Sequence, residues 1–407
     1  MLRRRPRAPS SFLPQTVAMH SDDIDALLRL LAAGGPSAPR RQLLAALGSP
    51  AAALGAGARA WREAGLSEAQ QAALQGPAPR ELVRSRDWLQ APEHHLLGWH
   101  DPDYPALLRR APSPPLALFV AGNPALLWHP AVAVVGSRSP TPGGRDNAAD
   151  FAHALAASGL AVASGLAAGI DAAAHVAALS AGGLTLAVIG TGPDVPYPRS
   201  HAGLHARIAE HGAVISEHPP GTGPQRQHFP SRNRILAGLT LGTLVVEAAE
   251  RSGALITARQ ATEAGREVFA VPGSIHNPLA RGCHRLIREG AGLVESASEV
   301  IAALAPLAAE LADDLRARLA APTSVGHGTV TSSRQPRERD STPVHHGGPA
   351  DDPDYQNLWQ ALGHDPTGMD QLVERTRLTA AQLSSMLLLM ELEGRVSSKH
   401  GRYYRNR

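Results

Sequence analysis

Cysteine is almost absent from this 407-residue sequence, which contains only Cys283. A single cysteine excludes an intramolecular disulfide framework. The 19 histidines are not accompanied by a CxxC pair or an HExxH helix, so a zinc site is not expected either. We therefore predict a protein of a reducing compartment that holds no metal and no cofactor.

Long hydrophobic runs are also missing. No stretch approaches the roughly 18 to 20 uninterrupted apolar residues that span a bilayer. The N-terminal stretch MLRRRPRAPSSFLPQTVAM lacks the apolar run of about 7 to 15 residues that a secretory signal contains. These absences favour a cytoplasmic protein without a membrane partner, and residues 1–18 are expected to form a disordered extension.

Lysine is as rare as cysteine, because Lys399 is the only lysine among the 39 Lys and Arg residues. The chain is also rich in alanine, glycine and proline, as in proteins with a GC-rich coding bias, so arginine in place of lysine is weak evidence at any one site. The formal net charge is only +3 and the pI is near 9.4. A polyanionic partner is permitted, but it has to be argued from a local basic patch.

Two regions outside the centre of the chain have patterns of their own, one typical of a helical domain and one typical of a linker. Residues 19–90 carry leucines at helical spacing between Gly, Ser and Pro stops, which indicates a small helical domain. We favour a packing role for it, and the alternative is a SAM-like or helix-hairpin-helix-like unit that contacts a nucleic-acid backbone. Residues 321–352 are rich in Ser, Thr, Pro and Gly and are expected to form a flexible linker.

The central residues 91–320 alternate short apolar runs with segments long enough for helices. The runs AVAVVG, LAVASG, LTLAVIG, AVISE, TLVVEA and EVFAVPG lie between about Val132 and Val294. Continuous hydrophobicity indicates strands buried on both faces, and the intervening helices supply the crossovers of parallel strands. We predict an α/β core with a doubly wound parallel sheet.

Residues 353–407 predict three short helices and a hairpin that turns at His400 and Gly401, which is the element order of a winged-helix domain. The third helix, AAQLSSMLLLMELEG, has two acids and no base, so it is poorly suited to read base edges. We favour a protein contact or an accessory DNA contact for this domain. The basic residues of the hairpin that are available for phosphates are Lys399, Arg402 and Arg405.

Candidate binding residues follow the predicted strands, because ligands of parallel sheets bind beyond the carboxyl ends of the strands. Glycine, serine and arginine dominate these positions and the adjoining helix starts. The candidates are Gly136, Ser137, Arg138, Ser164, Gly165, Gly169, Asp171, Arg199, Arg232, Asn233, Arg234, Ser252 and Gly253.

These turns do not support three familiar enzyme classes. The chain has no GxxxxGK[ST] loop for ATP hydrolysis, and the first strand is not followed by the GxGxxG of a nicotinamide site. None of the strand-to-helix turns carries the GxSxG of a serine hydrolase. What remains is an anion site without catalytic residues.

Four arginines could follow several phosphates of one flexible strand if they project over the same sheet edge, and two nearby aromatic residues could stack on bases. These residues are Arg138, Arg199, Arg232, Arg234, Tyr197 and Phe229. Alternatively, Arg232 and Arg234 pair with Glu217 or Glu247, and the aromatic residues only pack. An arginine in a tight turn at a strand end points into the cleft, which makes Arg138 the strongest candidate.

The strand ends and the segments that follow them form a series of longer motifs along the chain. In order, these are GSR, SGLAAGIDAAAH, VIGTGPDVPYPRSH, ISEHPPGTGPQRQHFPSRNRILAGL, VVEAAERSGALITARQATEAGREVFAVPG and GCHRLIREGAGLV, preceded by DPDYPALLRRAPSPPLALFVAGNPALL. Their order and spacing resemble the DNA-processing protein A family, also called DprA or Smf. The resemblance covers roughly Trp99 to Val294. The helical and winged-helix-like parts are similar to the accessory domains of that family, with weaker motifs.

The resemblance implies a Rossmann-like core that binds single-stranded DNA, protects incoming strands in natural transformation and recombination, and loads the RecA recombinase. It also implies a homodimer formed through the core. The arginine of the family's GSR turn falls on Arg138, and the basic residue after its Tyr-Pro pair falls on Arg199. The SGLAxGID and RNRIxAGL motifs fall on Ser164–Asp171 and Arg232–Leu239.

Two other classes of function stay open beside DNA binding without catalysis. Glycine-rich strand ends, with Glu247 near Gly253, also suit a Rossmann-like nucleotide-binding enzyme or sensor. The third class is a recruitment scaffold that acts through the C-terminal tail and the dimer surface.

Overall fold

A computed structural model describes residues 21–77, 81–319, 353–363, 365–392, 395–399 and 402–405. The predicted N-terminal extension and the predicted linker lie outside these ranges. Contacts group the chain into two units. The first ends at Asp314, and the second begins at Leu315 and also takes in residues 141–143. No helix of the described chain is both long and apolar enough to cross a membrane.

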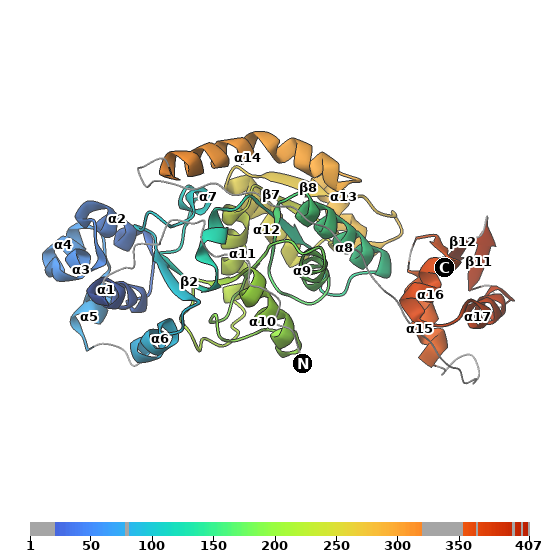
Figure 1. Ribbon diagram of the computed structural model, residues 1–407, viewed down its shortest axis with the longest axis horizontal. Coiled ribbons are helices and arrows are strands. Elements are labelled where there is room, and N and C mark those ends of the chain that lie inside the picture. The colour runs from blue at the N-terminus through green and yellow to red at the C-terminus, as the bar shows by residue number, and fades with distance from the viewer. Residues whose placement is uncertain are drawn as a thin grey trace, which may run out of the picture. The chain divides into compact units, whose positions relative to one another are not determined.

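A helical region precedes the sheet in the first unit. It consists of α1 (Ser21–Ala32), α2 (Ala38–Leu47), α3 (Pro50–Gly55), α4 (Gly57–Glu63), α5 (Glu68–Gln75) and α6 (Glu81–Leu89). Leu27, Leu44 and Trp61 are buried in one hydrophobic cluster that also contains Phe119 of strand β2 (Ala117–Gly122). The helices therefore pack on one edge of the sheet (Figure 1), and the predicted domain limit at residue 90 stays a prediction.

The described residues form a nine-stranded sheet in the order β1-β2-β6-β5-β4-β3-β7-β8-β9. Besides β2, its strands are β1 (His94–Gly98), β3 (Ala131–Val135), β4 (Ala161–Ser164), β5 (Thr185–Val188), β6 (Ala213–Ser216), β7 (Gly242–Val245), β8 (Glu267–Ala270) and β9 (Gly292–Leu293). Strands β3 to β9 pair in parallel, which confirms the predicted parallel sheet. The antiparallel edge formed by β1 and β2 was not predicted.

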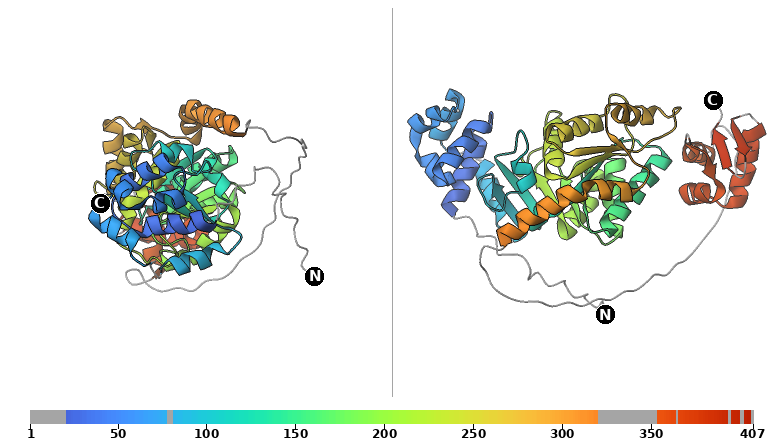
Figure 2. Two further views of the ribbon diagram at one scale, coloured as in Figure 1. Left: turned by 90° about the vertical axis from the view of Figure 1, so that its left-hand side faces the viewer. Right: turned by 90° about the horizontal axis from the view of Figure 1, so that it is seen from above.

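Helices cover both faces of the sheet. They are α7 (Ala106–Arg109), α8 (Pro142–Ala157), α9 (Ile170–Ser180), α10 (Ala202–His211), α11 (His228–Leu239), α12 (Gly253–Glu263), α13 (Arg281–Arg288) and α14 (Ala297–Leu319). In β3, Val134 packs in a cluster with Phe151 of α8 and Leu304 of α14, whereas Val135 packs in a cluster with Leu236 of α11. Burial on both faces explains the continuous apolar runs. Helix α14 lies along the outside of this core (Figure 2).

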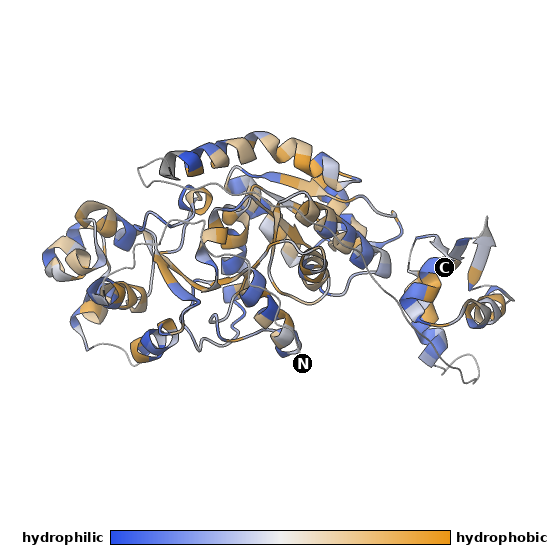
Figure 3. Cartoon of the chain, in the orientation of Figure 1, coloured by the Kyte–Doolittle hydropathy of each residue, from blue (hydrophilic) through white to orange (hydrophobic). Residues whose placement is uncertain are grey.

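Hydropathy follows this layering. The strands of the sheet are hydrophobic, and the exposed sides of the surrounding helices are more hydrophilic (Figure 3). Strand β3 is buried at each of its five positions. The layered α/β core is therefore organised as its sequence pattern predicts.

The second unit contains the C-terminal winged-helix fold, which confirms the predicted order of elements. It consists of α15 (Pro353–Leu362), β10 (Thr367–Gly368), α16 (Met369–Thr376), α17 (Ala380–Leu392), β11 (Val396–Lys399) and β12 (Arg402–Arg405). The hairpin residues His400 and Gly401 lie outside the described residues. On α17, Leu387 is buried in the core of the domain while Leu388 is 58% exposed. The Cζ atom of Arg405 lies 3.8 Å from the ring centroid of Trp359.

A buried histidine makes the stability of the core depend on pH. His175 of α9 is fully buried, and its Nδ1 lies 2.7 Å from the hydroxyl of Thr185, which itself donates to the carbonyl of Val162. Thr185 therefore accepts from Nδ1–H, and Nε2 is buried without a partner. Burial, with the positive charge of Arg232 as a smaller cause, lowers the pKa of His175 to about 3.

We expect acidification to destabilise the wild type through this residue. Because the pKa of His175 is lower in the folded than in the unfolded chain, its stabilising contribution is complete above pH 6.5 and is lost as the pH falls towards 3. Between pH 7 and 5 the loss is about 2 kcal/mol. Urea unfolding at both pH values measures it. His175→Gln should lower the free energy of unfolding at pH 7. Between pH 7 and 5, its free energy of unfolding should decrease less than that of the wild type. An equal decrease in both proteins would contradict the assignment.

Candidate nucleic-acid interface

The candidate site lies where the strand order reverses. Strands β4 to β6 lie on one side of β3 and β7 to β9 on the other, so the carboxyl ends of β3 and β7 border the crevice of a doubly wound sheet. The turn after β3 is held on both sides. The backbone N–H of Ser137 donates to the carbonyl of Glu247 after β7 at 2.7 Å, and the N–H of Ile170 donates to the carbonyl of Ser137 at 3.1 Å.

Glycine is required at the start of this turn. A Cβ atom on Gly136 would lie 2.8 Å from the carbonyl oxygen of Glu247 and 2.7 Å from Ile170, closer than real Cβ contacts. The turn can therefore lie against the end of β7 only because residue 136 has no side chain. Arg138, two residues further on, is exposed at the rim of the crevice.

A cavity of about 760 Å³, here called the switch-point cavity, opens at this crevice. It brings together most of the predicted residues, from segments far apart in the sequence. Those that line it are Gly136, Ser137, Arg138, Gly165, Asp171, Arg232, Asn233, Ser252 and Gly253, together with Tyr197 and Phe229. The predicted residues that do not line it are Ser164, Gly169, Arg199 and Arg234.

Aromatic rings and a guanidinium form one series at the rim. The ring centroids of Tyr197 and Phe229 are 5.4 Å apart, and the Cζ atom of Arg138 lies 5.8 Å from the Phe229 centroid. Tyr197 is 44% exposed. Flat π surfaces open to solvent beside a cation are the groups on which unpaired bases stack.

Three arginines at the cavity are exposed and carry their charge without a carboxylate partner. Arg138, Arg226 and Arg251 form no ion pair with any residue in the described part of the chain. Arg226 and Arg251 were not among the predicted site residues. Arg251 directly follows the β7 turn, whereas Arg226 has no sequence signal beyond its place in the long loop before α11.

Helix α12 begins at the same cavity, and its N-terminus adds a partial positive charge to that of the arginines. Its first residue, Gly253, lines the cavity, and the hydroxyl of Ser252 accepts from the N–H of Ala254 at 3.3 Å. A helix N-terminus carries a partial positive charge from its unpaired N–H groups. The backbone and the free guanidinium groups therefore both favour an anion in this cavity.

Arg232 differs from these arginines because it is only 5% exposed. Its Nη1 donates to the carbonyl of Gly165 at 2.5 Å and also to the carbonyl of Val188, so it joins the ends of β4 and β5. Burial lowers the pKa of Arg232 to about 10, partly offset by Asp171, and the guanidinium stays charged at neutral pH. Its Nη1 serves the backbone and its Nε donates to the side chain of Asn233, so Arg232 supports the fold at this edge, and a contact with DNA stays a prediction.

Asp171 is the carboxylate that accompanies this buried arginine. Its Oδ2 accepts from the N–H groups of Gly165 at 3.1 Å and Ala167 at 3.3 Å. Burial raises the pKa of Asp171, and the charge of Arg232 and these two hydrogen bonds act in the opposite direction. The carboxylate therefore shapes the loop after β4 rather than facing a ligand as a free base.

The predicted residues outside the cavity have other contacts or face solvent. Arg234 forms an ion pair with Glu217, which is the alternative that the sequence had left open. The hydroxyl of Ser164 donates to the carbonyl of Val134 at 2.6 Å. Gly169 has a φ of +83° and lies against the turn at Ser137. Arg199 is exposed two residues after Tyr197 and forms no ion pair within the described chain.

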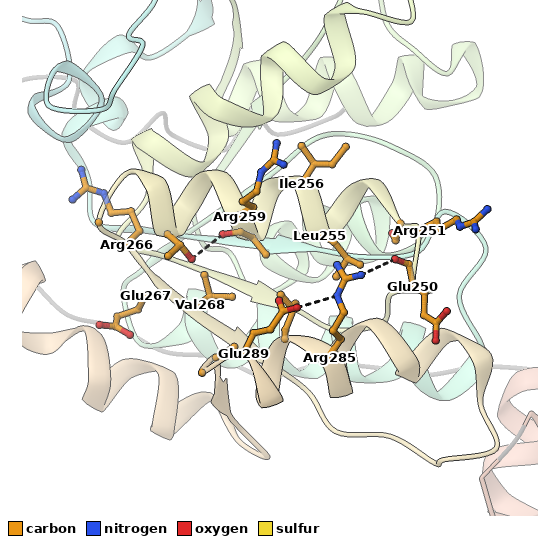
Figure 4. A pocket seen from close by; sticks show the side chains of 17 residues that line it. Glu250, Arg251, Leu255, Ile256, Arg259, Arg266, Glu267, Val268, Arg285 and Glu289 are labelled. Atoms are coloured by element: carbon orange, nitrogen blue, oxygen red, sulfur yellow. Dashed lines mark hydrogen bonds and ion pairs between the residues drawn. The ribbon is translucent and has the colours of Figure 1, made fainter.

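A larger hollow of about 930 Å³ lies between α12 and α13, and its lining carries charges of both signs, including Arg251, which also lines the switch-point cavity. Arg285 donates to the carbonyl of Glu250 at 3.3 Å and forms an ion pair with Glu289 at 3.4 Å (Figure 4). Arg259 is paired with Glu263 at 3.4 Å. The carboxylates Glu250, Glu267 and Glu289 beside these arginines make this hollow a weaker anion site than the smaller switch-point cavity.

The chain matches known proteins over most of its length. Residues 95–305, more than half of the chain, match the family described as DNA recombination-mediator protein A, and residues 343–402 match the DprA winged helix domain. Protein Smf of Synechocystis is 39% identical over 318 residues, which cover 75% of this chain and 79% of that protein. Protein Smf of Escherichia coli is 38% identical over 331 residues, or 81% and 82% of the two chains.

A solved structure agrees with these sequence matches. The X-ray structure of DNA processing protein A from Streptococcus pneumoniae is similar with a TM-score of 0.61 at 38% identity, over 67% of this chain and 95% of that one. The parallel sheet, the winged-helix fold and the extended sequence matches lead to one conclusion: the chain belongs to the DNA processing protein A family, whose members are also named DprA or Smf.

Proposed function

We propose that this protein binds single-stranded DNA without sequence preference, and that the switch-point cavity is the centre of the binding surface. One observation carries the proposal: the exposed Arg138, Arg226 and Arg251, which have no ion-pair partner among the described residues, line a cavity that also presents the rings of Tyr197 and Phe229. Guanidinium groups bind phosphates, and aromatic rings stack on bases irrespective of their identity. A single strand supplies both groups at once, because its bases are free.

The cavity supports binding rather than catalysis. The described residues that line it include no histidine, cysteine or lysine, and the one carboxylate among them, Asp171, is buried and accepts from backbone N–H groups. General acid–base chemistry needs a titratable group that can reach the reacting atom. We therefore propose no catalytic residue and no cofactor.

A free nucleotide is the second candidate ligand. The volume of about 760 Å³ lies within the range of about 300 to 1,000 Å³ that is usual for small-molecule sites. A thermal-shift screen of nucleotides, combined with an assay for released phosphate or base, distinguishes this candidate. Turnover would favour an enzyme, and a shift without turnover would favour a sensor.

The cellular role follows from the family. We propose that the protein protects incoming single strands in natural transformation and recombination, loads RecA onto them, and acts as a homodimer in the cytoplasm. Strand exchange by purified RecA on pre-coated DNA tests the loading role. Light scattering tests the dimer, whose mass would be about twice the chain mass of 42.6 kDa.

Phe229→Leu is expected to weaken binding to single strands and to leave the weaker binding to duplex DNA unchanged. The leucine keeps the apolar volume but removes the ring, and the loss of base stacking is worth about 1 to 3 kcal/mol per base. In duplex DNA the bases are already stacked inside the helix. Mobility shifts with single-stranded and duplex DNA of one sequence measure the difference.

Phe229→Tyr serves as the matched control because it keeps the ring, and it should retain the affinity of the wild type. Equal losses on both kinds of DNA, or none on either, would contradict a stacking role for Phe229.

A further inference from the structure

A second basic cavity, here called the α2 cavity, lies between the helical region and the sheet. Its volume is about 540 Å³. It is bordered by the turn between α1 and α2, the start of β2 and the residues after β6. The charged side chains in its lining are Arg40, Arg41, Arg234 and Glu217, with His218 beside them. No residue of this cavity except Arg234 was predicted to belong to a site.

The charges in the α2 cavity do not balance. Among the described residues that line it, Glu217 is the only one with a carboxylate, and it is paired with Arg234. Arg40 and Arg41 form no ion pair within the described chain. Burial lowers the pKa of Arg41, and the nearby positive charge of Arg234 acts in the same direction. The lining of the cavity therefore carries an excess of positive charge from Arg40 and Arg41.

Arg40 is the more unusual of the two because it is only 4% exposed. Its Nη2 donates to the carbonyl of Gly35 at 2.8 Å and its Nη1 to the carbonyl of Leu30, while its buried Nε has no partner. Burial, and then repulsion from Arg41, lowers the pKa of Arg40 to about 10. A buried charge without a counter-ion is costly, and a bound anion would offset that cost.

The N-terminus of α2 points to the same ligand class. Its N-cap residue, Ser37, has φ −80° and ψ −20° and makes no capping hydrogen bond with its side chain. The hydroxyl instead accepts from the guanidinium of Arg41. Ser37 and Ala38 both line the cavity, so the uncapped first turn of a ten-residue helix faces it. Pro39 in this turn has no N–H, so the remaining N–H groups of the turn and the helix dipole are what favour a phosphate at this position.

We propose that the α2 cavity binds a phosphate group, contacted by Arg41 and the N-terminus of α2 and balanced by the buried charge of Arg40, whose Nη1 and Nη2 already donate to backbone carbonyls. The inference rests on the proposed function in one respect: in the DNA-bound protein the phosphate belongs to the same single strand. Helix α11 connects the two cavities, since Arg232 and Asn233 line the switch-point cavity and Arg234 lines the α2 cavity. A strand that leaves the first cavity across the start of α11 reaches the second.

Arg41→Gln in the full chain tests the proposal with oligothymidylates of about 5 and about 30 nucleotides. Affinity for the longer strand should fall about tenfold, as expected for a charge-assisted hydrogen bond. The slope of log affinity against log salt should flatten by about 0.7, the value for one phosphate of a single strand. Affinity for the shorter strand should not change. Arg62→Gln, an exposed arginine of α4 outside both cavities, is the matched control and should behave as wild type.

Ser37→Asp gives a test that does not depend on damage to the fold. An aspartate at the N-cap stabilises a helix, but here its charge would occupy the phosphate position. We expect the melting temperature to be unchanged or higher while the affinity for the longer strand falls as in Arg41→Gln. Two results together would overturn the proposal: normal affinity of both variants for the longer strand, and no Arg41-dependent binding in the phosphate titration described below.

Calorimetric titration with inorganic phosphate and with thymidine monophosphate identifies the source of the phosphate. Binding that is lost in Arg41→Gln, with unchanged affinity for the longer strand, would support the cavity with a free phosphate compound as its ligand. No Arg41-dependent binding of any of the probes would overturn the proposal. Failure of the proposed function is a separate result, because it would appear as normal DNA affinity in Arg138 variants.

Discussion

Replacing Arg138 and Arg199 together with alanine is expected to weaken binding to single-stranded DNA by about 100-fold or more, at about 1.5 to 3 kcal/mol for each charged hydrogen bond lost. Both side chains are exposed and form no ion pair within the described chain, so their loss removes only the contact of Arg138 with the ring of Phe229 at the rim. The melting temperature should therefore stay within a few degrees of the wild type. Fluorescence anisotropy at several salt concentrations should also show a flatter salt dependence, by about 0.7 for each phosphate contact.

Two further variants define what the arginines contribute. Arg138→Lys keeps the charge but not the planar group beside Phe229, so its affinity should lie between those of the wild type and Arg138→Ala. Arg207→Ala removes an exposed arginine of α10 that lines neither cavity and should bind normally. If the double variant kept wild-type affinity, the switch-point cavity would not be the DNA site.

Arg232→Met is expected to act on stability instead, although Arg232 lines the same cavity. The substitution leaves the buried carbonyls of Gly165 and Val188 without this donor and removes the nearby positive charge that lowers the pKa of Asp171. Leaving a buried acceptor without a donor costs about 1 to 3 kcal/mol for each carbonyl. Urea unfolding at pH 7 measures the change.

An exposed arginine provides the comparison for this result. Arg259→Met breaks only an exposed pair with Glu263 and should cost less than about 1 kcal/mol. Preserved stability in Arg232→Met, combined with lost DNA binding, would show that Arg232 contacts the strand directly and that its contacts to the backbone carbonyls are dispensable.

These two expected results distinguish arginines that support the fold from arginines that bind a ligand, although the sequence motif places them close together. Arg232 and Arg234 lie in one helical turn of α11, yet the first is buried against backbone carbonyls and the second is paired with Glu217. The charges that remain free for a ligand come from three separate loops, at Arg138, Arg226 and Arg251. Binding and stability are thus assigned to different guanidinium groups at one edge of the sheet.

Most of the core could be predicted from local pattern. Val134 and Val135 pack on opposite faces of β3, and this two-sided burial is what makes the run AVAVVG continuous. The helices between such runs supply the parallel crossovers, and the carboxyl ends of the strands then have to lie at one edge. The sequence by itself therefore determined the layered core, the order of the winged-helix elements and the turns that surround the cavity.

Only the tertiary structure decided which side chains are free at that edge. Glu217 and Arg234 are 17 residues apart, and Arg41 reaches the carbonyl of Pro114 across 73 residues, so neither contact has a local signature. The antiparallel β1 and β2 were missed for the same reason, because β2 pairs with β6, which lies far from it in the sequence, and β1 pairs with β2 across a connection that contains α7. A guanidinium binds a ligand or supports the fold according to its burial and its nearest acceptor, and both depend on how distant segments pack.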